Sequence, residues 1–304
     1  IIFVLVAAIG IYAIFLFLSD FSIILEKISN FKINYLPLIL LLVSVSWIPL
    51  IIKWHFLLKN SRINVPLTKS IAIFFSGSAF EVTPGQIGIL IKSQLLKTSS
   101  NISRTKTIPI VIVEKIYDLI GAILASVIGI IILGMEFYLI IIAISVLATI
   151  FFFMYHRRSS ELVFNRITKL KFFSKYIDNM SEFYEVVKKS TSVKAATICI
   201  LLALTYWFII SAAAYYTLIA FDVNLLDYLK VLAIYATSTL LGAISFIPGG
   251  IGITEGSIAG LFTLNGVDVS TALILSVMIR ILTLWYSVSV GFISLKFTGG
   301  LSLK

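Results

Sequence analysis

The chain has 304 residues, of which 60% are hydrophobic and 12% are charged, and its mean hydropathy is +1.08. A soluble protein of this size could not hide so many apolar side chains, because its surface must carry something polar. The formal net charge is +10, but the cations lie mostly in loops between apolar segments. Positive-inside topology and anionic lipid headgroups explain such loops better than nucleic acid does. We therefore expect a membrane protein that binds no nucleic acid.

Several apolar segments reach the roughly 20 residues that a helix needs to cross a bilayer. We place them at about 1–19, 35–52, 107–133, 137–155, 195–219 and 270–295. The first has no small-residue cleavage site, so we interpret it as a membrane helix and not as a signal peptide. The prediction is an all-α polytopic membrane protein with about six full transmembrane helices, in which residues 1–304 form a single transmembrane domain.

Polar residues at the edges of these segments are typical of a membrane interface. The second segment is expected to end in Lys53, Trp54 and His55, and His156 follows the fourth. Cys199 is the one cysteine, so neither a disulfide within the chain nor a cysteine-based metal site is expected. The sequence has no Walker A loop, dinucleotide fingerprint or His-rich metal motif, so no metal and no cofactor is predicted.

Two further apolar segments, at about 71–97 and 229–264, are interrupted by proline and glycine. Both contain Pro-Gly-x-Ile-Gly, at 84–88 and at 248–252, with Glu81 before the first copy and Glu255 after the second. Proline removes a backbone donor, and glycine tolerates backbone angles that other residues avoid. Paired interruptions of this kind in two halves of a chain point to a transporter site. We therefore predict two re-entrant, broken-helix hairpins, with plain loops as the alternative.

The charges of the connecting loops indicate the orientation. The linkers beside the first hairpin and residues 156–194 are basic, whereas 220–228 is acidic. The positive-inside tendency then places both termini and 156–194 in the cytoplasm of a multi-pass plasma-membrane protein. The hairpins are then expected to enter the membrane from opposite sides. The two pseudo-repeat halves, at about 35–155 and 195–296, are therefore expected to be inverted relative to each other. The 156–194 linker is either a basic amphipathic helix on the cytoplasmic leaflet or a plain solvated connector.

Charged residues within the apolar segments form the candidate site. Each costs about 2.5–3.5 kcal/mol at bilayer depth, so it persists only if it is paired or hydrated. Glu114 and Asp118 are four residues apart and share one helix face, from which Lys115 is expected to point away. Lys92 has no evident counterpart in the second half, and Arg280 lies where the first half has these acids. Structural ion pairs, and snorkelling of Lys92 to the cytoplasmic face, are the alternatives.

If the hairpin tips meet, the charges and the loop glycines would ring one cavity. Unpaired N–H groups at the half-helix ends would then favour a phosphate held with Arg280 and Lys92. The predicted substrate-binding residues are Glu81, Pro84, Gly85, Gly88, Lys92, Glu114, Lys115, Asp118, Pro248, Gly249, Gly250, Gly252, Glu255 and Arg280, and no catalytic residue is assigned. Downstream, Gly256 and Gly260 form a GxxxG element, which predicts a close helix contact.

These motifs, in this order, resemble the lysylphosphatidylglycerol synthase transmembrane, or flippase-like, domain family. The family pattern is matched by Pro84 to Gly88 with Lys92, by Glu114-Lys115 with Asp118, by Pro248 to Glu255, and by Arg280. Ile89 departs from it, because the family usually has a Glu there; a role that needs this carboxylate would fall to Glu81. The resemblance implies lipid translocation, here without the transferase domain that some members carry.

Our first hypothesis is therefore a translocase for a phospholipid or a polyprenyl-phosphate-linked sugar, with an anionic or zwitterionic headgroup. A second is a membrane-embedded transferase or hydrolase acting on a lipid phosphate, with Glu255 or Asp118 as base. A third is a non-catalytic scaffold that docks a partner enzyme through residues 156–194. The sequence leaves open a homo-oligomer and a partner transferase.

Overall fold

The computed structural model describes residues 10, 29–132, 137–155 and 180–298. All of the regular elements in these ranges are helices, as predicted. They are η1 (Ile33–Tyr35), α3 (Leu36–Asn60), α4 (Leu67–Ser78), η2 (Pro84–Leu90), α5 (Ile91–Ser100), α6 (Arg104–Ile132), α7 (Phe137–Tyr155), α10 (Met180–Ser190), α11 (Val193–Ala220), α12 (Tyr228–Ile244), η3 (Pro248–Gly250), α13 (Ile253–Leu264), α14 (Val269–Arg280), η4 (Ile281–Trp285) and α15 (Tyr286–Phe297). The predicted first segment and most of the 156–194 linker lie outside the described residues.

Three of the described helical stretches are long and apolar enough to cross a membrane. They are Ile33–Asn60, Val193–Ala220 and Val269–Phe297. The last joins α14 and α15 through η4, a single π-helical turn directly after Arg280. Helices α6 and α7 cover the predicted third and fourth segments, but α6 carries charges near its middle. The total of six full crossings remains a prediction.

The predicted end of the second segment is wrong. Helix α3 continues to Asn60, and the side chains of Lys53 and Trp54 have no exposed surface. They are therefore interior residues and not anchors at a lipid interface. The physical reason is that Lys53 has a carboxylate partner within the fold, Asp118, so its charge does not need to reach water.

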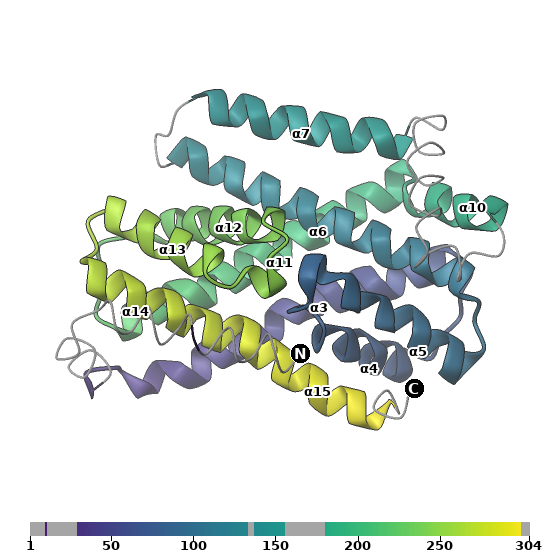
Figure 1. Cartoon of the computed structure of the whole chain (residues 1–304), viewed down its shortest axis with the longest axis horizontal. Coiled ribbons are helices and arrows are strands. Elements are labelled where there is room, and N and C mark those ends of the chain that lie inside the picture. The colour runs from purple at the N-terminus through teal and green to yellow at the C-terminus, as the bar shows by residue number, and fades with distance from the viewer. Residues whose placement is uncertain (1–9, 11–28, 133–136, 156–179, 299–304) are drawn as a thin grey trace.

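Both interrupted segments form helical hairpins that break where proline predicts. The first is α4–η2–α5 and the second is α12–η3–α13. Thr83 and Ile247, which precede the two prolines, have extended backbone, as expected of a residue before proline. In Figure 1 the two hairpins lie at opposite ends of the long helices, α4 and α5 at the right, α12 and α13 at the left.

The two hairpins share a turn geometry. Gln86 and Gly250, each two residues after the proline, have φ of 54° and 65°. Their amides donate to the carbonyl oxygens of Thr83 and Ile247, each at 2.8 Å. The repeated sequence motif therefore folds into a repeated local structure, although a glycine occupies this left-handed position only in the second copy.

Each hairpin packs against a helix of the other half. Helix α4 packs on α15, and α12 packs on α6, while α3 and α11 lie against each other. The tips also meet, because Val82 beside the first turn packs with Ile251 and Val288. This reciprocal arrangement is what two halves of similar fold produce when they interlock. The boundaries of the pseudo-repeat remain a prediction.

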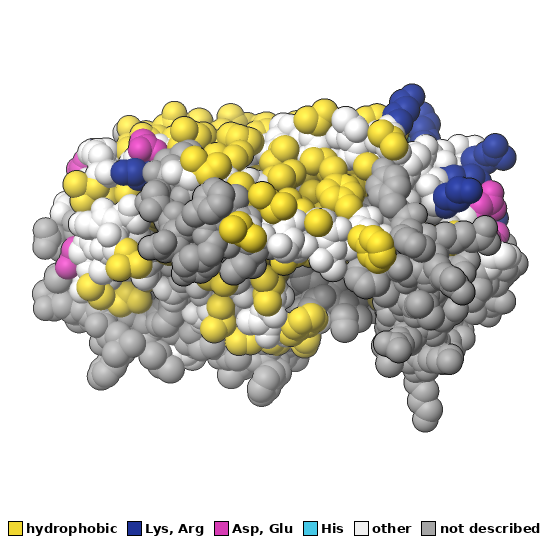
Figure 2. Space-filling model, turned by 90° about the horizontal axis from the view of Figure 1, so that it is seen from above, with side chains coloured by type: hydrophobic (Ala, Val, Ile, Leu, Met, Phe, Trp, Pro, Cys, Tyr) yellow, Lys and Arg dark blue, Asp and Glu magenta, His cyan; other side chains and the backbone are white. Residues whose placement is uncertain are grey.

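The surface fits a membrane protein. Figure 2 shows a broad hydrophobic area, with Lys and Arg side chains gathered at its right-hand end. Large apolar side chains such as Leu41, Ile48 and Leu201 are 58%, 51% and 59% exposed. At one end of the helices Asn60 donates to the carbonyl of Lys189 at 2.7 Å, so the loop after α3 lies beside the end of α10.

Helix α10 docks on the helical body. Phe183, Val186 and Val187 form its apolar face and are buried against α6 and its neighbours. The Tyr117 hydroxyl of α6 donates to the carbonyl of Ser190 at 2.9 Å, which ties the end of α10 to the body. In this described part of the 156–194 linker, the apolar face contacts protein and does not lie on a lipid leaflet.

The close contact predicted at the GxxxG element does not form within the described chain. Gly256 and Gly260 are exposed, and a Cβ at Gly260 would meet open space. Close packing occurs instead at Gly291 of α15, where a Cβ would strike the backbone of Ala79, and at Gly121 of α6, opposite Ala203. Spacing alone did not identify the glycines that face another helix.

Candidate functional site

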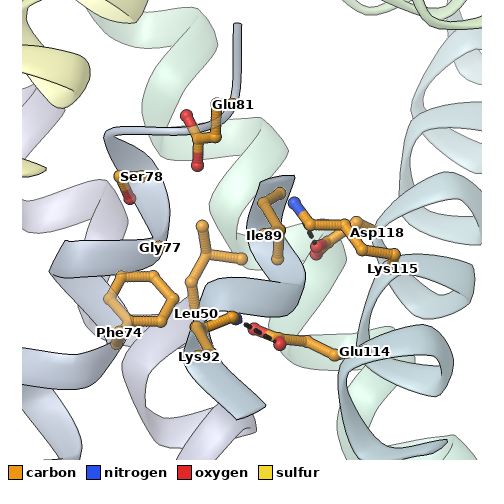
Figure 3. Close-up of a pocket in the computed structure, with 10 residues that line it drawn as sticks. All are labelled: Leu50, Phe74, Gly77, Ser78, Glu81, Ile89, Lys92, Glu114, Lys115 and Asp118. Carbon is orange, nitrogen blue, oxygen red and sulfur yellow. Dashed lines mark hydrogen bonds and ion pairs between the residues drawn. The ribbon is translucent and has the colours of Figure 1, made fainter. Parts of the chain in front are cut away.

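A polar cavity lies in the first half, among α3, α4, α5 and α6 (Figure 3). Its lining comprises Leu50, Phe74, Gly77, Ser78, Glu81, Ile89, Lys92, Glu114, Lys115 and Asp118. Five of the predicted site residues therefore surround one space. The cavity volume is about 20 Å³, which admits a water molecule and no lipid headgroup.

Lys92 and Glu114 form a buried ion pair beneath this cavity. Lys92 Nζ lies 2.5 Å from Glu114 Oε2, and the two side chains are only 3% and 2% exposed. The ammonium also lies 4.3 Å from the centre of the Trp54 ring, a cation–π distance. A Cβ on Gly77 would touch the Lys92 chain, so glycine leaves room for it. Lys92 therefore does not snorkel to the surface.

Asp118 is shared by two lysines. Its Oδ1 accepts from Lys53 of α3, and its Oδ2 lies 3.5 Å from Lys115 Nζ. The prediction that Lys115 points away from Asp118 is wrong, because a long side chain three residues back on a helix can reach the same face. The prediction from sequence did not include Lys53 in the site, because a lysine close to the expected end of a segment resembles an interfacial anchor.

Glu81 and Lys115 are less buried than Lys53, Lys92 and Glu114. Glu81 follows α4 and is half-buried at the top of the cavity in Figure 3, beside Ser78. No ion pair of Glu81 is formed with any described residue, and Lys115 and Lys92 line the same cavity. The Lys115 side chain is 34% exposed and points from α6 toward the cavity.

The second half contains a separate, tighter charge cluster. Arg280 Nε donates to Glu255 Oε1 at 2.8 Å, and its Nη2 donates to the carbonyl oxygen of Gly249. Glu255 Oε2 in turn accepts from the Gly252 amide at 2.7 Å, at the start of α13. A carboxylate there is favoured by the helix dipole. The pair therefore joins α13, α14 and the hairpin loop.

Several of the loop donors predicted to hold phosphate already have acceptors in this structure. Besides the Gly252 amide, the amides of Gly250 and Ile251 donate to the carbonyls of Ile247 and Pro248, at 2.8 Å and 3.3 Å. In the first hairpin the Gly88 amide donates to Thr83 Oγ1 at 2.9 Å. Pro84 is exposed at this turn. The binding roles of these loop residues stay predictions.

The structure supplies the counterpart of Lys92 that the sequence lacked. In each half, a residue at the start of the second hairpin helix pairs with the following long helix: Lys92 with Glu114, and Glu255 with Arg280. The two pairs occupy corresponding places with reversed signs. Sequence comparison of the halves misses this correspondence because it matches residue types and not ion pairs.

Two tyrosines of the second half bring hydroxyl groups near the charge clusters. Tyr206 of α11 is close enough to interact electrostatically with Glu81, Asp118 and Arg280. Tyr235 of α12 donates to Thr283 Oγ1 at 3.2 Å, within the π-helical turn that follows Arg280. Both hydroxyls were overlooked because the sequence gave no reason to separate them from packing aromatics.

Comparison with known proteins bears on the family of this chain. The family model described as the lysylphosphatidylglycerol synthase TM region matches residues 4–291. The chain belongs to this family. It is also 27% identical over 291 residues to UPF0104 membrane protein PH1989 of Pyrococcus horikoshii, covering 85% of each chain. UPF0104 membrane protein MJ1078 of Methanocaldococcus jannaschii is 24% identical over 211 residues, 66% of this chain and 86% of the relative.

The buried ion pairs should contribute to the stability of the protein. Replacing Lys53 with methionine should lower the free energy of unfolding by about 3 kcal/mol, because Asp118 loses its buried partner. Thermal unfolding of the purified protein in detergent measures this. Lys59→Met on the same helix is the matched control, since Lys59 is exposed. Equal melting temperatures for the two variants would contradict the assigned pair.

Proposed function

We propose that the protein is a membrane translocase for a phosphate-containing lipid. The observation that carries the proposal is that two broken-helix hairpins, at opposite ends of the long helices, meet at their tips beside a polar cavity. Broken helices of this kind, in inverted halves, are the elements from which alternating-access carriers are built. Polar groups deep in a membrane protein mark a substrate path by default.

Lys115 is the cation best placed to take a lipid phosphate. Lys53, Lys92 and Arg280 are each closed in a buried ion pair, with side chains no more than 5% exposed. Lys115 is partly exposed and its contact with Asp118 is longer, at 3.5 Å. A headgroup phosphate would replace this loose contact with a direct charge-assisted hydrogen bond. The present cavity is too small for a headgroup, so transport requires the cavity to widen.

Replacing Lys115 with glutamine should slow lipid translocation at least about tenfold, because one charge-assisted hydrogen bond to phosphate is lost. The assay follows fluorescent phospholipids across the bilayer of proteoliposomes that contain the purified protein. Lys106→Gln is the matched control on the same helix, since Lys106 is exposed and pairs with Glu182 at the surface. Translocation by Lys115→Gln at the wild-type rate would contradict this site, and no translocation by the wild type would contradict the function.

The transferase or hydrolase hypothesis has a weaker basis. Glu255 and Asp118, its candidate bases, are both held by cations in the described structure. A carboxylate held in this way is a poor base until its partner leaves. Product formation from a labelled polyprenyl-phosphate donor, by the purified protein in detergent, would favour this activity over translocation.

A further inference from the structure

The charged side chains around the cavity of the first half differ in whether they have a close ion-pair partner. Lys92 with Glu114 and Lys53 with Asp118 are close ion pairs, and Arg280 with Glu255 is a third in the other half. A charge already neutralised by a close partner offers little to a ligand, because binding must first break the pair. The groups left to recognise a ligand are therefore those that the close pairs do not use.

One carboxylate and one ammonium meet this condition. Glu81 has no ion-pair partner in the described part of the chain, and it lies at the cavity wall that the turn after α4 forms. Lys115 approaches from the opposite wall, on α6, with only a 3.5 Å contact to Asp118. The two attract each other across the cavity without forming an ion pair. A carboxylate and an ammonium on opposite walls can each bind the oppositely charged group of one ligand. Glu81 is the pole that would bind an ammonium, and Lys115 is the pole that would bind a phosphate.

We propose that this cavity, once widened, recognises a zwitterionic headgroup, with Glu81 accepting a primary ammonium and Lys115 donating to the phosphate of the same molecule. This rests on the proposed function and specifies its substrate class. A purely anionic headgroup would satisfy Lys115 but bring its negative charge close to Glu81. A phosphoethanolamine-type headgroup satisfies both poles and leaves the three close ion pairs intact, so no buried charge loses its partner.

Ser78 supports the ammonium pole. It lines the cavity next to Glu81, and its hydroxyl provides a second oxygen acceptor on that wall. A primary ammonium has three N–H donors, so a carboxylate and a hydroxyl together satisfy it better than they satisfy a quaternary ammonium, which has none. The geometry therefore favours ethanolamine over choline as the amine.

The transport arm of the test uses the full chain in proteoliposomes with acyl-labelled phosphatidylethanolamine, phosphatidylglycerol and phosphatidylcholine. We expect the ethanolamine lipid to cross about tenfold faster than the glycerol lipid, the effect of one charge-assisted hydrogen bond. Glu81→Gln should bring the two rates close together, and Lys115→Gln should slow both. Equal wild-type rates for the two lipids, or an unchanged preference in Glu81→Gln, would overturn the inference.

The binding arm separates this inference from the proposed function, and a lipid from a free headgroup. Glycerophosphoethanolamine, glycerophosphoglycerol and inorganic phosphate are each added to the purified protein in detergent, and thermal unfolding is followed. Stabilisation by the first alone, lost in Glu81→Gln, supports the site even if no lipid is transported, which would overturn only the translocase proposal. Translocation without headgroup preference, and no stabilisation by glycerophosphoethanolamine, would overturn the inference and leave the translocase proposal standing.

Discussion

Replacing Arg280 with methionine should lower the free energy of unfolding by about 3–5 kcal/mol, because it leaves the Glu255 carboxylate buried without its cation. Glu255 is fully buried and Arg280 is 4% exposed, so water cannot take the place of the guanidinium. The same change removes the hydrogen bond to the Gly249 carbonyl, which holds the second hairpin loop to α14. Thermal or denaturant unfolding of the purified protein measures the loss.

A paired substitution separates the missing charge from general disruption. Combining Arg280→Met with Glu255→Gln should recover much of the lost stability, because no unpaired charge remains in the interior. Glutamine at this position can still accept the Gly252 amide, as in a capping box. A double variant as unstable as Arg280→Met alone would show that packing, and not the ion pair, makes Arg280 necessary.

Replacing Gly291 with alanine should destabilise the protein by about 2–3 kcal/mol, the cost of overpacking a close contact. The added Cβ would strike the backbone of Ala79, at the end of α4, and backbone cannot rotate out of the way as a side chain can. Helix α15 must then move off the first hairpin. We therefore expect the proposed lipid translocation to fall along with the melting temperature.

Gly260→Ala is the matched control for this substitution. Gly260 also lies inside an apolar helix, but a Cβ there meets nothing within 4 Å. Its replacement should leave stability unchanged or raise it by up to about 1 kcal/mol, because alanine is the better helix former. A smaller loss for Gly291→Ala than for Gly260→Ala would contradict the described packing of α15 on α4.

The positions of most helices could be predicted from local sequence. Apolar runs predicted α7 and α11 to within about two residues, because a helix in lipid must satisfy its own backbone and shows this in its composition. The hairpin breaks were predicted from Pro84 and Pro248, because proline lacks a backbone donor and clashes with the preceding helical turn. The prediction failed at Lys53, where a buried charge resembled the end of a segment.

The partners of the charges could not be predicted. Lys92, Glu114 and Asp118 were recognised as costly charges, but their distances along the chain do not say which of them meet. Lys53 reaches Asp118 across 65 residues, and both orders of charge occur, Lys92 with Glu114 and Glu255 with Arg280. Pairing depends on where two helices cross, which depends on the packing of the whole bundle.

The amino-acid sequence by itself determined that this is an all-helical membrane protein, where its helices break, and to which family it belongs. These properties depend on residue type and on neighbours along the chain. Only the tertiary structure decided which residues form the three close ion pairs and that Glu81 and Lys115 face each other across a cavity. Coulomb attraction and burial depend on distance in space, and the interlocking of the two halves sets those distances.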